Sequence, residues 1–208
     1  NGSGQLGISN TEDQKLPVKT TLTNIKQIST SYYHTIALTE DGKAYVAGRN
    51  NEGELGIGQT TSSTITTWTI MKSTNGTSEM TGIKQVATGY MHTVVLTDNG
   101  YMYATGNNGY YQLSDGSSTQ RKNLVYMKDS SNNTMKDVKE IYAAGNTSVA
   151  ITNSNGIYVV GENSYAQLLQ GNTSTVTRFT KVKNSENIDK IVMTTTTGSQ
   201  TTAYVDNI

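Results

Sequence analysis

The sequence contains no cysteine, a single proline (Pro17), one phenylalanine and one tryptophan among its 208 residues. Without cysteine the chain forms no disulfide bond and has no thiolate for catalysis or metal binding. Its apolar stretches are no longer than one strand, so we expect no membrane insertion. Only 34% of the residues are hydrophobic, and threonine, serine, asparagine and tyrosine are abundant. This composition is typical of bacterial cell-surface and secreted proteins.

Positive and negative charges are balanced, with 16 Lys and Arg residues against 16 Asp and Glu residues. No long run of either sign occurs along the chain. Nucleic-acid binding depends on clustered Lys and Arg side chains that neutralise phosphates. The sequence therefore favours partners other than nucleic acid.

One pattern recurs four times with a period of about 55 residues. Two apolar residues three positions apart precede an alternating run, an Asp-Gly or Asn-Gly pair and a second run that ends in glycine. The copies start at Ile25, Ile83, Val138 and Ile188, and the last stops at Ile208, where its turn should be. Such repeats bury their apolar faces by stacking on neighbours. We therefore expect a single array with units at residues 1–48, 49–106, 107–161 and 162–208.

Each unit predicts antiparallel strands and no helix. β-Branched residues dominate the second strand, as a pleated surface prefers, at Thr35–Thr39, Thr93–Thr97 and Ser148–Thr152. Two-residue turns of the primed type, with positive φ at both residues, are expected at Asp41-Gly42, Asn99-Gly100 and Asn155-Gly156. An outer strand is expected in the variable stretch that follows, at Thr66–Met71, Asn123–Lys128 and Thr177–Val182.

The combined pattern resembles the regulator-of-chromosome-condensation repeats. The likeness is carried by Gln5-Leu6-Gly7, His34–Thr39 and Asp41-Gly42, recurs around His92, and weakens towards Thr147, which stands where a histidine is expected. The resemblance implies an all-β fold, a β-propeller of four-stranded antiparallel blades, of which about four are present here. Since such propellers usually have about seven blades, the chain would be a partial ring or a fragment of one.

Both ends of the chain fall inside a repeat, so the array is expected to have open blade edges. An open edge presents unpaired N–H and C=O groups that invite pairing with another chain. A homodimer that meets through these edges is therefore a hypothesis that the sequence suggests.

The two histidines, His34 and His92, hold the same position in successive repeats. They are either ligands or acid–base groups in a central channel, or hydrogen-bonding residues that tie strand to strand within a blade. We favour the second interpretation, because no acidic residue stands at a fixed offset to orient both, and paired metal ligands normally lie closer together. The sequence therefore predicts no catalytic residue, no metal site and no cofactor.

Aromatic residues supply the candidate binding surface. Tyr32, Tyr33, Tyr90, Met91 and Asn146 occupy the loop just before the histidine position, and matching loops should emerge at one end of the ring. Tyrosine and methionine are common in binding surfaces. They could equally pack between blades, which is the interpretation we favour for a second set at Tyr110, Tyr111 and Tyr165. Trp68 is either an exposed anchor or the lid of an outer strand.

These observations predict a non-enzymatic protein–protein interaction module of a bacterial surface or secreted protein, which binds a protein partner through loops on one propeller face. A module that binds a glycan or cell-wall polymer is the alternative, followed by a hydrolase or lyase hosted in the channel. A guanine-nucleotide exchange role, known within the family, is disfavoured because the chain has no basic tail and no wedge-like insertion. The expected location is extracellular or at the cell surface, with a cytoplasmic one as the alternative.

Overall fold

The computed structural model of the chain is built from β-strands and their connections, and it describes residues 1–183, 190–195 and 201–206. In these residues no helix is long and apolar enough to cross a membrane. The predicted start of the fourth repeat at Ile188 and the end of the chain at Ile208 lie outside them. The predicted all-β fold is confirmed.

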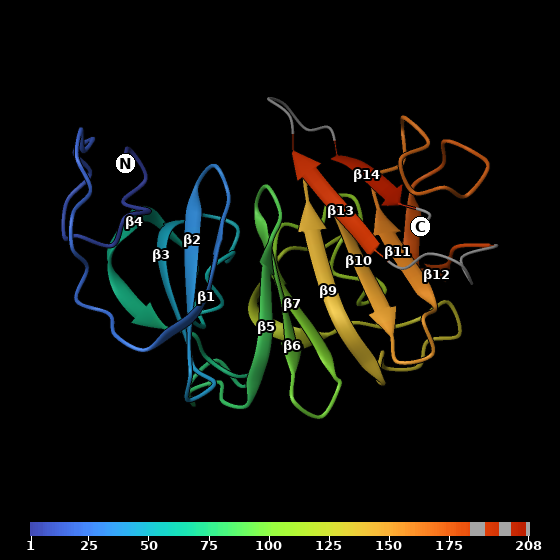
Figure 1. The fold of residues 1–208 in the computed structure, drawn as a ribbon, viewed down its shortest axis with the longest axis horizontal. Helices are drawn as coiled ribbons and strands as arrows, with labels where there is room; N and C mark the ends of the chain where they lie inside the picture. Colours follow the sequence, from blue (N-terminus) through green and yellow to red (C-terminus); the bar gives the residue numbers. More distant parts are fainter. Residues whose placement is uncertain (184–189, 196–200, 207–208) are drawn as a thin grey trace.

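Three four-stranded antiparallel sheets follow one another along the chain, and we name them blades one, two and three (Figure 1). Blade one contains β1 (Ile25–Thr30), β2 (His34–Thr39), β3 (Ala44–Asn50) and β4 (Thr61–Ile70). Blade two contains β5 (Ile83–Thr88), β6 (His92–Thr97), β7 (Met102–Gly106) and β8 (Arg121–Tyr126). Blade three contains β9 (Val138–Ala144), β10 (Thr147–Thr152), β11 (Ile157–Gly161) and β12 (Val176–Lys181). A two-stranded sheet of β13 (Lys190–Thr195) and β14 (Thr201–Asp206) comes next.

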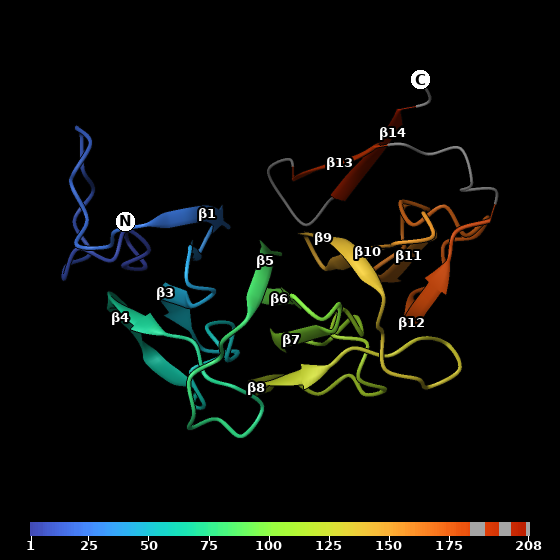
Figure 2. The same ribbon diagram turned by 60° about the horizontal axis from the view of Figure 1, so that its bottom comes forward.

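In every blade the strands lie in chain order from the inner to the outer edge. Figure 2 shows the inner strands β1, β5 and β9 side by side, with the outer strands β4, β8 and β12 spread at the periphery. The second strands β2 and β6 are buried along their whole length. Because successive side chains of a strand point to opposite faces, both faces of these strands are covered. This is the arrangement of propeller blades packed face to face.

The turn between the second and third strands differs from the predicted two-residue type. Gly42 has a φ of 75°, but Asp41 has no positive φ. The Gly42 N–H donates to the Thr39 carbonyl at 3.0 Å, and the Thr39 N–H donates to the Lys43 carbonyl at 2.9 Å. This pattern is a three-residue loop in which a type I turn is followed by a left-handed residue. In blade three the left-handed residue is Asn155, with a φ of 61°, so an asparagine there does what glycine does elsewhere.

A buried asparagine organises the turn that follows the third strand. Asn50 Oδ1 accepts the N–H of Leu55 at 3.1 Å, and its Nδ2 donates to the Gln59 carbonyl at 2.7 Å. Asn108 and Asn163 make the equivalent bonds in the next two blades. These bonds satisfy backbone groups that the tight turn removes from water.

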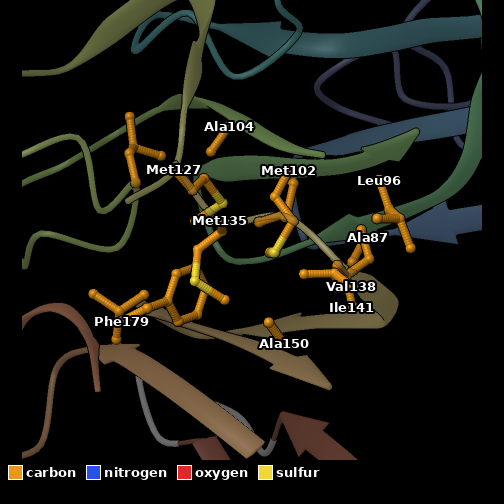
Figure 3. Close-up of a cluster of buried hydrophobic side chains, with 13 residues drawn as sticks. Ala87, Leu96, Met102, Ala104, Met127, Met135, Val138, Ile141, Ala150 and Phe179 are labelled. Carbon is orange, nitrogen blue, oxygen red and sulfur yellow. The ribbon is translucent and has the colours of Figure 1, made fainter. Parts of the chain in front are cut away.

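Apolar side chains from both neighbours fill the space between blades two and three (Figure 3). Blade two contributes Leu96 and Met102, and blade three contributes Ile141 and Phe179, each of them fully buried. Burying a side chain of this size contributes about 1.5–3 kcal/mol. A similar cluster joins blades one and two, so neighbouring blades supply much of each other's core.

Side-chain amides join the inner strands of neighbouring blades. Gln27 Nε2 donates to the Val86 carbonyl at 2.8 Å, and Gln27 Oε1 accepts the Val86 N–H at 3.0 Å. Gln85 makes the same pair of bonds with Ile141, at 2.8 and 2.9 Å. We call this pair of bonds the glutamine clamp. It gives the edge strand of the next blade a donor and an acceptor in place of a pairing strand. In blade three the equivalent residue is Glu140, whose carboxylate cannot donate.

The glycine that closes the third strand allows two backbone segments to cross. Gly106 has a φ of 105°, and a Cβ at this position would lie 2.4 Å from the Met91 carbonyl oxygen. Gly48 and Gly161 hold the same position in the other blades, with φ values of 123° and 118°. A side chain here would therefore be strained and would also push the neighbouring loop aside.

We expect Gly106→Ala to lower the free energy of unfolding by about 1–3 kcal/mol from backbone strain alone. Gly2→Ala is the matched control, because no atom lies within 4 Å of a Cβ at Gly2 and its φ is not positive. Urea denaturation of both variants measures the difference. Equal stability of the two variants would contradict the proposed role of the crossing.

Candidate partner-binding rim

Two sets of loops emerge at the same end of the three blades, and we call this end the rim. Since the strands of a blade are antiparallel and in chain order, the first and third connections of each blade lie at one end. These connections are residues 31–33 and 51–60 in blade one, 89–91 and 107–120 in blade two, and 145–146 and 162–175 in blade three.

Three of the predicted tyrosines form one cluster on the rim. The rings of Tyr32 and Tyr33 meet edge to face, with centroids 4.7 Å apart. The rings of Tyr33 and Tyr90 lie 5.3 Å apart, and their hydroxyl oxygens are 3.2 Å apart. Tyr32 is 73% exposed, whereas Tyr33 and Tyr90 are half-buried. The hydrogen bond with Tyr33 raises the pKa of the Tyr90 hydroxyl, so it stays protonated at neutral pH.

Arg49, which follows the closing glycine of blade one, links this cluster to Met91. Its guanidinium carbon lies 5.0 Å from the centroid of the Tyr33 ring, a cation–π distance, and its Nη1 lies 3.2 Å from Met91 Sδ. Carboxylate oxygens of Glu52 and Glu54 lie 3.5 and 3.8 Å from the same guanidinium group. The tyrosine cluster is thus held against blade one by an ordered, largely buried cation.

Asn146 also lies on the rim, but its side chain is engaged within blade three. Its Nδ2 donates to Glu162 Oε2 at 2.9 Å, and its carbonyl accepts the Glu162 N–H at 3.1 Å. The preceding residue, Gly145, accepts the N–H of Tyr90 at 2.8 Å. This bond connects the loop of blade three to that of blade two.

Trp68 does not join the other candidates. It lies within the outer strand β4, where its Nε1 donates to Thr20 Oγ1 at 2.7 Å. A Cβ at Gly7 would lie 2.5 Å from the indole ring, so the N-terminal turn packs directly on it. Of the two alternatives from the sequence, the structure therefore supports the lid of an outer strand.

The expectation that the second tyrosine set packs between blades is wrong for two of its members. Tyr110 is 41% exposed and Tyr165 is 66% exposed, both in the rim turns. Arg49 and Glu52, in turn, were not predicted from the sequence. Both residues lie close after the closing glycine of blade one, at the start of a rim turn. Charged residues are common in turns, so this position alone does not identify a binding residue.

The two histidines link blades to each other rather than strands within a blade, which corrects the sequence prediction. His34 Nε2 lies 3.1 Å from Thr93 Oγ1 in blade two, and His92 Nε2 lies 3.0 Å from Ser148 Oγ in blade three. The Thr93 hydroxyl donates to the Glu54 carbonyl at 2.7 Å, so it accepts the proton of the imidazole Nε2. Both imidazoles are fully buried.

Burial sets the protonation state of these imidazoles. Loss of solvation lowers the pKa of His34 to about 3, with further lowering by His92 and Arg49. Loss of solvation lowers the pKa of His92 to about 4. Ser31 Oγ lies 2.8 Å from Nδ1 of His34, while Nδ1 of His92 has no hydrogen-bond partner. Both side chains are therefore neutral links between blades at physiological pH.

Glu54 is a buried carboxyl group at a position where the other units have glutamine: Gln5, Gln112 and Gln167. Its Oε2 accepts the Glu52 N–H at 2.8 Å, as the side-chain oxygen of each glutamine does in its own turn. Its Oε1 has no hydrogen-bond partner. Loss of solvation raises the pKa of this carboxyl, and the backbone N–H groups of Glu54 and Glu52 and the nearby Arg49 oppose that effect.

Sequence profiles of the regulator of chromosome condensation (RCC1) repeat match residues 1–38 and 41–96, and a second profile matches 25–54 and 83–112. Together the matches cover residues 1–112, which include the N-terminal turn, blade one and the strands β5, β6 and β7 of blade two. The chain belongs to the RCC1 repeat family. In the described part of this RCC1-repeat chain, no group of three or more His, Cys, Asp or Glu side chains is arranged to hold a metal ion.

Named relatives include several regulatory proteins. The chain is 34% identical over 143 residues to the human X-linked retinitis pigmentosa GTPase regulator, covering 69% of this chain and 13% of the relative. It is 29% identical over 175 residues to the Arabidopsis thaliana ultraviolet-B receptor UVR8, covering 83% and 38%. It is 35% identical over 117 residues to the secretion-regulating guanine nucleotide exchange factor of Bos taurus, covering 54% and 24%. The chain thus spans well under half of each of these relatives.

Solved structures agree on the fold. Prp20p from Saccharomyces cerevisiae superimposes with a TM-score of 0.72 at 20% identity, over 93% of this chain and 47% of that one. Human WBSCR16 superimposes with a TM-score of 0.71 at 19% identity, over 87% and 45%. The three blades therefore correspond to part of an RCC1-type propeller, which confirms the predicted fold class.

The buried imidazoles predict a specific loss of stability in acid. Because their folded pKa values lie below the unfolded value near 6.5, the unfolded chain takes up protons that the folded chain excludes. This contribution to stability is complete above pH 6.5 and is lost as the pH falls towards 4. We expect His92→Gln to reduce the loss of unfolding free energy between pH 7 and pH 5 by roughly 2 kcal/mol. An unchanged loss, measured by urea denaturation at both pH values, would show that the imidazole is protonated in the folded state.

The Glu54→Gln variant tests how much the burial of the Glu54 carboxylate lowers the free energy of unfolding. We expect the variant to be more stable at pH 7 by about 1 kcal/mol, because an amide removes the buried negative charge and restores the residue of the other units. Glu52→Gln is the control, since that carboxylate also faces Arg49 but is partly exposed. If Glu54→Gln is the less stable variant, the ion pair with Arg49 outweighs the cost of burial.

Proposed function

We propose that this RCC1-type array is a non-enzymatic module that binds a protein partner through its rim. The observation that carries this proposal is the tyrosine cluster, in which the ring of the 73% exposed Tyr32 packs on Tyr33 and the ring of Tyr33 packs on Tyr90. A large aromatic side chain held rigidly loses little conformational entropy on binding, so it makes an efficient anchor.

The chemistry around the cluster suits a peptide surface. The hydroxyl groups of Tyr33 and Tyr90 are hydrogen-bonding groups on the aromatic cluster, and the carboxylate of Glu52 pairs with Arg49, which lies over the Tyr33 ring. Protein interfaces commonly have such an apolar centre with a polar margin. Tyr110 and Tyr165 add exposed aromatic surface in the rim turns of blades two and three.

The relatives of the chain support a protein partner. A GTPase regulator and a guanine nucleotide exchange factor are, by their names, proteins that act on other proteins. Prp20p likewise has binding properties towards Gsp1p and histones. Since the chain covers only part of these proteins, a protein partner for this chain is part of the proposal.

A catalytic role has less support. The two imidazoles, which would be the first choice for proton transfer, are buried, neutral and engaged between blades. Of the carboxyl groups in the described residues, Glu54 has a raised pKa, and it is buried beside Arg49. We further propose a bacterial surface or secreted location, for which the support is the composition rich in threonine, serine and asparagine and free of cysteine.

The test is a quantitative pull-down from an extract of the source organism with the intact chain, Tyr32→Ala and Tyr126→Ala. Tyr126 is the matched control because it is an exposed tyrosine of the outer strand β8, away from the rim. We expect proteins retained by the intact chain and by Tyr126→Ala to be depleted at least tenfold by Tyr32→Ala. Equal retention by all three would refute the rim assignment, and retention of polysaccharide in place of protein would favour the glycan alternative.

A further inference from the structure

A cavity of about 580 Å³ lies between blades two and three, at the end of the blades opposite the rim. Blade three contributes Thr152 and Tyr158, and the loop that joins β8 to β9 contributes Asp129, Thr134 and Lys136. Sites for small molecules have volumes of roughly 300–1,000 Å³. The cavity is therefore large enough for a ligand, and it is separate from the tyrosine cluster of the rim.

Blade three lacks a ring that covers the equivalent tyrosine of blade two. Tyr158 and Tyr103 are equivalent, because each pairs with the same position of the second strand. In blade two the outer strand places Tyr126 beside Tyr103, with ring centroids 4.6 Å apart, and Tyr103 is only 8% exposed. In blade three the residue that pairs with Tyr158 is Lys181. Tyr158 is accordingly half-buried and lines the cavity.

A glycine leaves further space beside the Tyr158 ring. Gly156 stands two residues before Tyr158, where blade two has Tyr101, whose ring lies 6.2 Å from that of Tyr126. A Cβ at Gly156 would lie 3.1 Å from Tyr158 Cε2, so a larger side chain here would occupy the space next to the ring. Two tyrosines of blade two are thus replaced in blade three by a glycine and a lysine.

The side chains around Tyr158 have hydrogen-bonding capacity that the described part of the chain does not use. In that part, the hydroxyl groups of Tyr158 and Thr134 and the ammonium group of Lys136 make no hydrogen bond. Asp129 Oδ1 accepts two backbone N–H groups of its own loop at 2.9 Å, whereas Oδ2 accepts a single, longer bond of 3.4 Å from Asn133 Nδ2. A ligand that both donates and accepts hydrogen bonds would match these groups.

The cavity also has an apolar part. Met135, which lies in the cluster between the blades (Figure 3), is buried and lines the cavity together with Tyr158. The sugar ring of a saccharide has an apolar face of C–H groups that packs on an aromatic ring, because the face of the aromatic ring is negative. Its hydroxyl groups donate and accept hydrogen bonds at the border of that face. A saccharide therefore fits both parts of the lining.

We propose that this cavity binds a neutral saccharide, and that it is a second site, independent of the protein-binding rim. One sugar ring packs on Tyr158, Asp129 Oδ2 accepts hydrogen bonds from its hydroxyl groups, and Lys136 donates to them. Asp129 and Lys136 are the charged side chains of the lining, and their opposite charges balance, which favours a neutral ligand over an anionic one.

The binding experiment follows the amide chemical shifts of the ¹⁵N-labelled chain during titration with cellotriose, chitotriose or maltotriose. We expect at least one of them to bind with a Kd of about 1 mM, so concentrations up to about 10 mM are needed. Shifts are expected at residues 129–136 and 152–158 and not at the rim residues 31–33. The dipeptide Ala-Ala is titrated in parallel, because its amine and carboxylate would match Asp129 and Lys136 without a sugar ring.

Lys181→Tyr tests the position of the ligand, because it restores the residue type that covers Tyr103 in blade two. We expect it to raise the Kd about tenfold or more. Lys136→Ala, at an exposed position, removes one donor and should raise the Kd about fivefold. Tyr32→Ala is the matched control, since it removes the rim anchor and should leave the Kd unchanged. The thermal midpoint of each variant shows whether it is folded.

Shifts confined to the rim, or an unchanged Kd in both lysine variants, would overturn the assignment to this cavity. Shifts caused by Ala-Ala and by none of the three saccharides would overturn the ligand class. The absence of any shift would refute the site. Each of these results leaves the proposed function untouched, because capture of a protein through Tyr32 depends on the other end of the blades.

Discussion

A primary amide is the one neutral side-chain group that presents a hydrogen-bond donor and acceptor side by side, as a peptide unit does. The inner strands β5 and β9 depend on that property. Each is the edge strand of a narrow sheet, and its outward N–H and C=O groups would otherwise stand open at the interface between blades. Gln27 and Gln85 satisfy these groups without adding a strand, so the blades can meet face to face and bury their apolar residues.

The buried imidazoles complement this contact on the second strand. An imidazole is long enough to cross from one blade to a hydroxyl group of the next, and it remains neutral because burial lowers its pKa. The first rim loops of blades one and two end directly before these links, since Tyr33 and Met91 precede the two histidines. The geometry of the candidate binding surface is therefore set by the contact between blades rather than by the loops alone.

Much of the fold was predictable because its signals are local and repeated. The alternation of apolar and polar residues predicted the strands. The Asp-Gly and Asn-Gly pairs predicted the position of each hairpin but not its turn type. The turn type depends on one backbone hydrogen bond, and two-residue and three-residue loops favour the same residue types. The rim location of Tyr32, Tyr33 and Tyr90 also followed from their phase in the repeat. The partners of the histidines did not, because a spacing along the chain does not reveal whether a side chain points into its own sheet or towards the next. Arg49 was missed for a similar reason, as its role comes from a ring in another loop.

The glutamine clamp has a direction: blades one and two each hold the blade that follows in the chain, through Gln27 and Gln85. A repeat unit that is duplicated within the gene together with its glutamine therefore carries the side chain that binds the next blade. The array can lengthen by one unit without a compensating change elsewhere. At Glu140 a carboxylate cannot make this pair of bonds, although β13 still lies against β9.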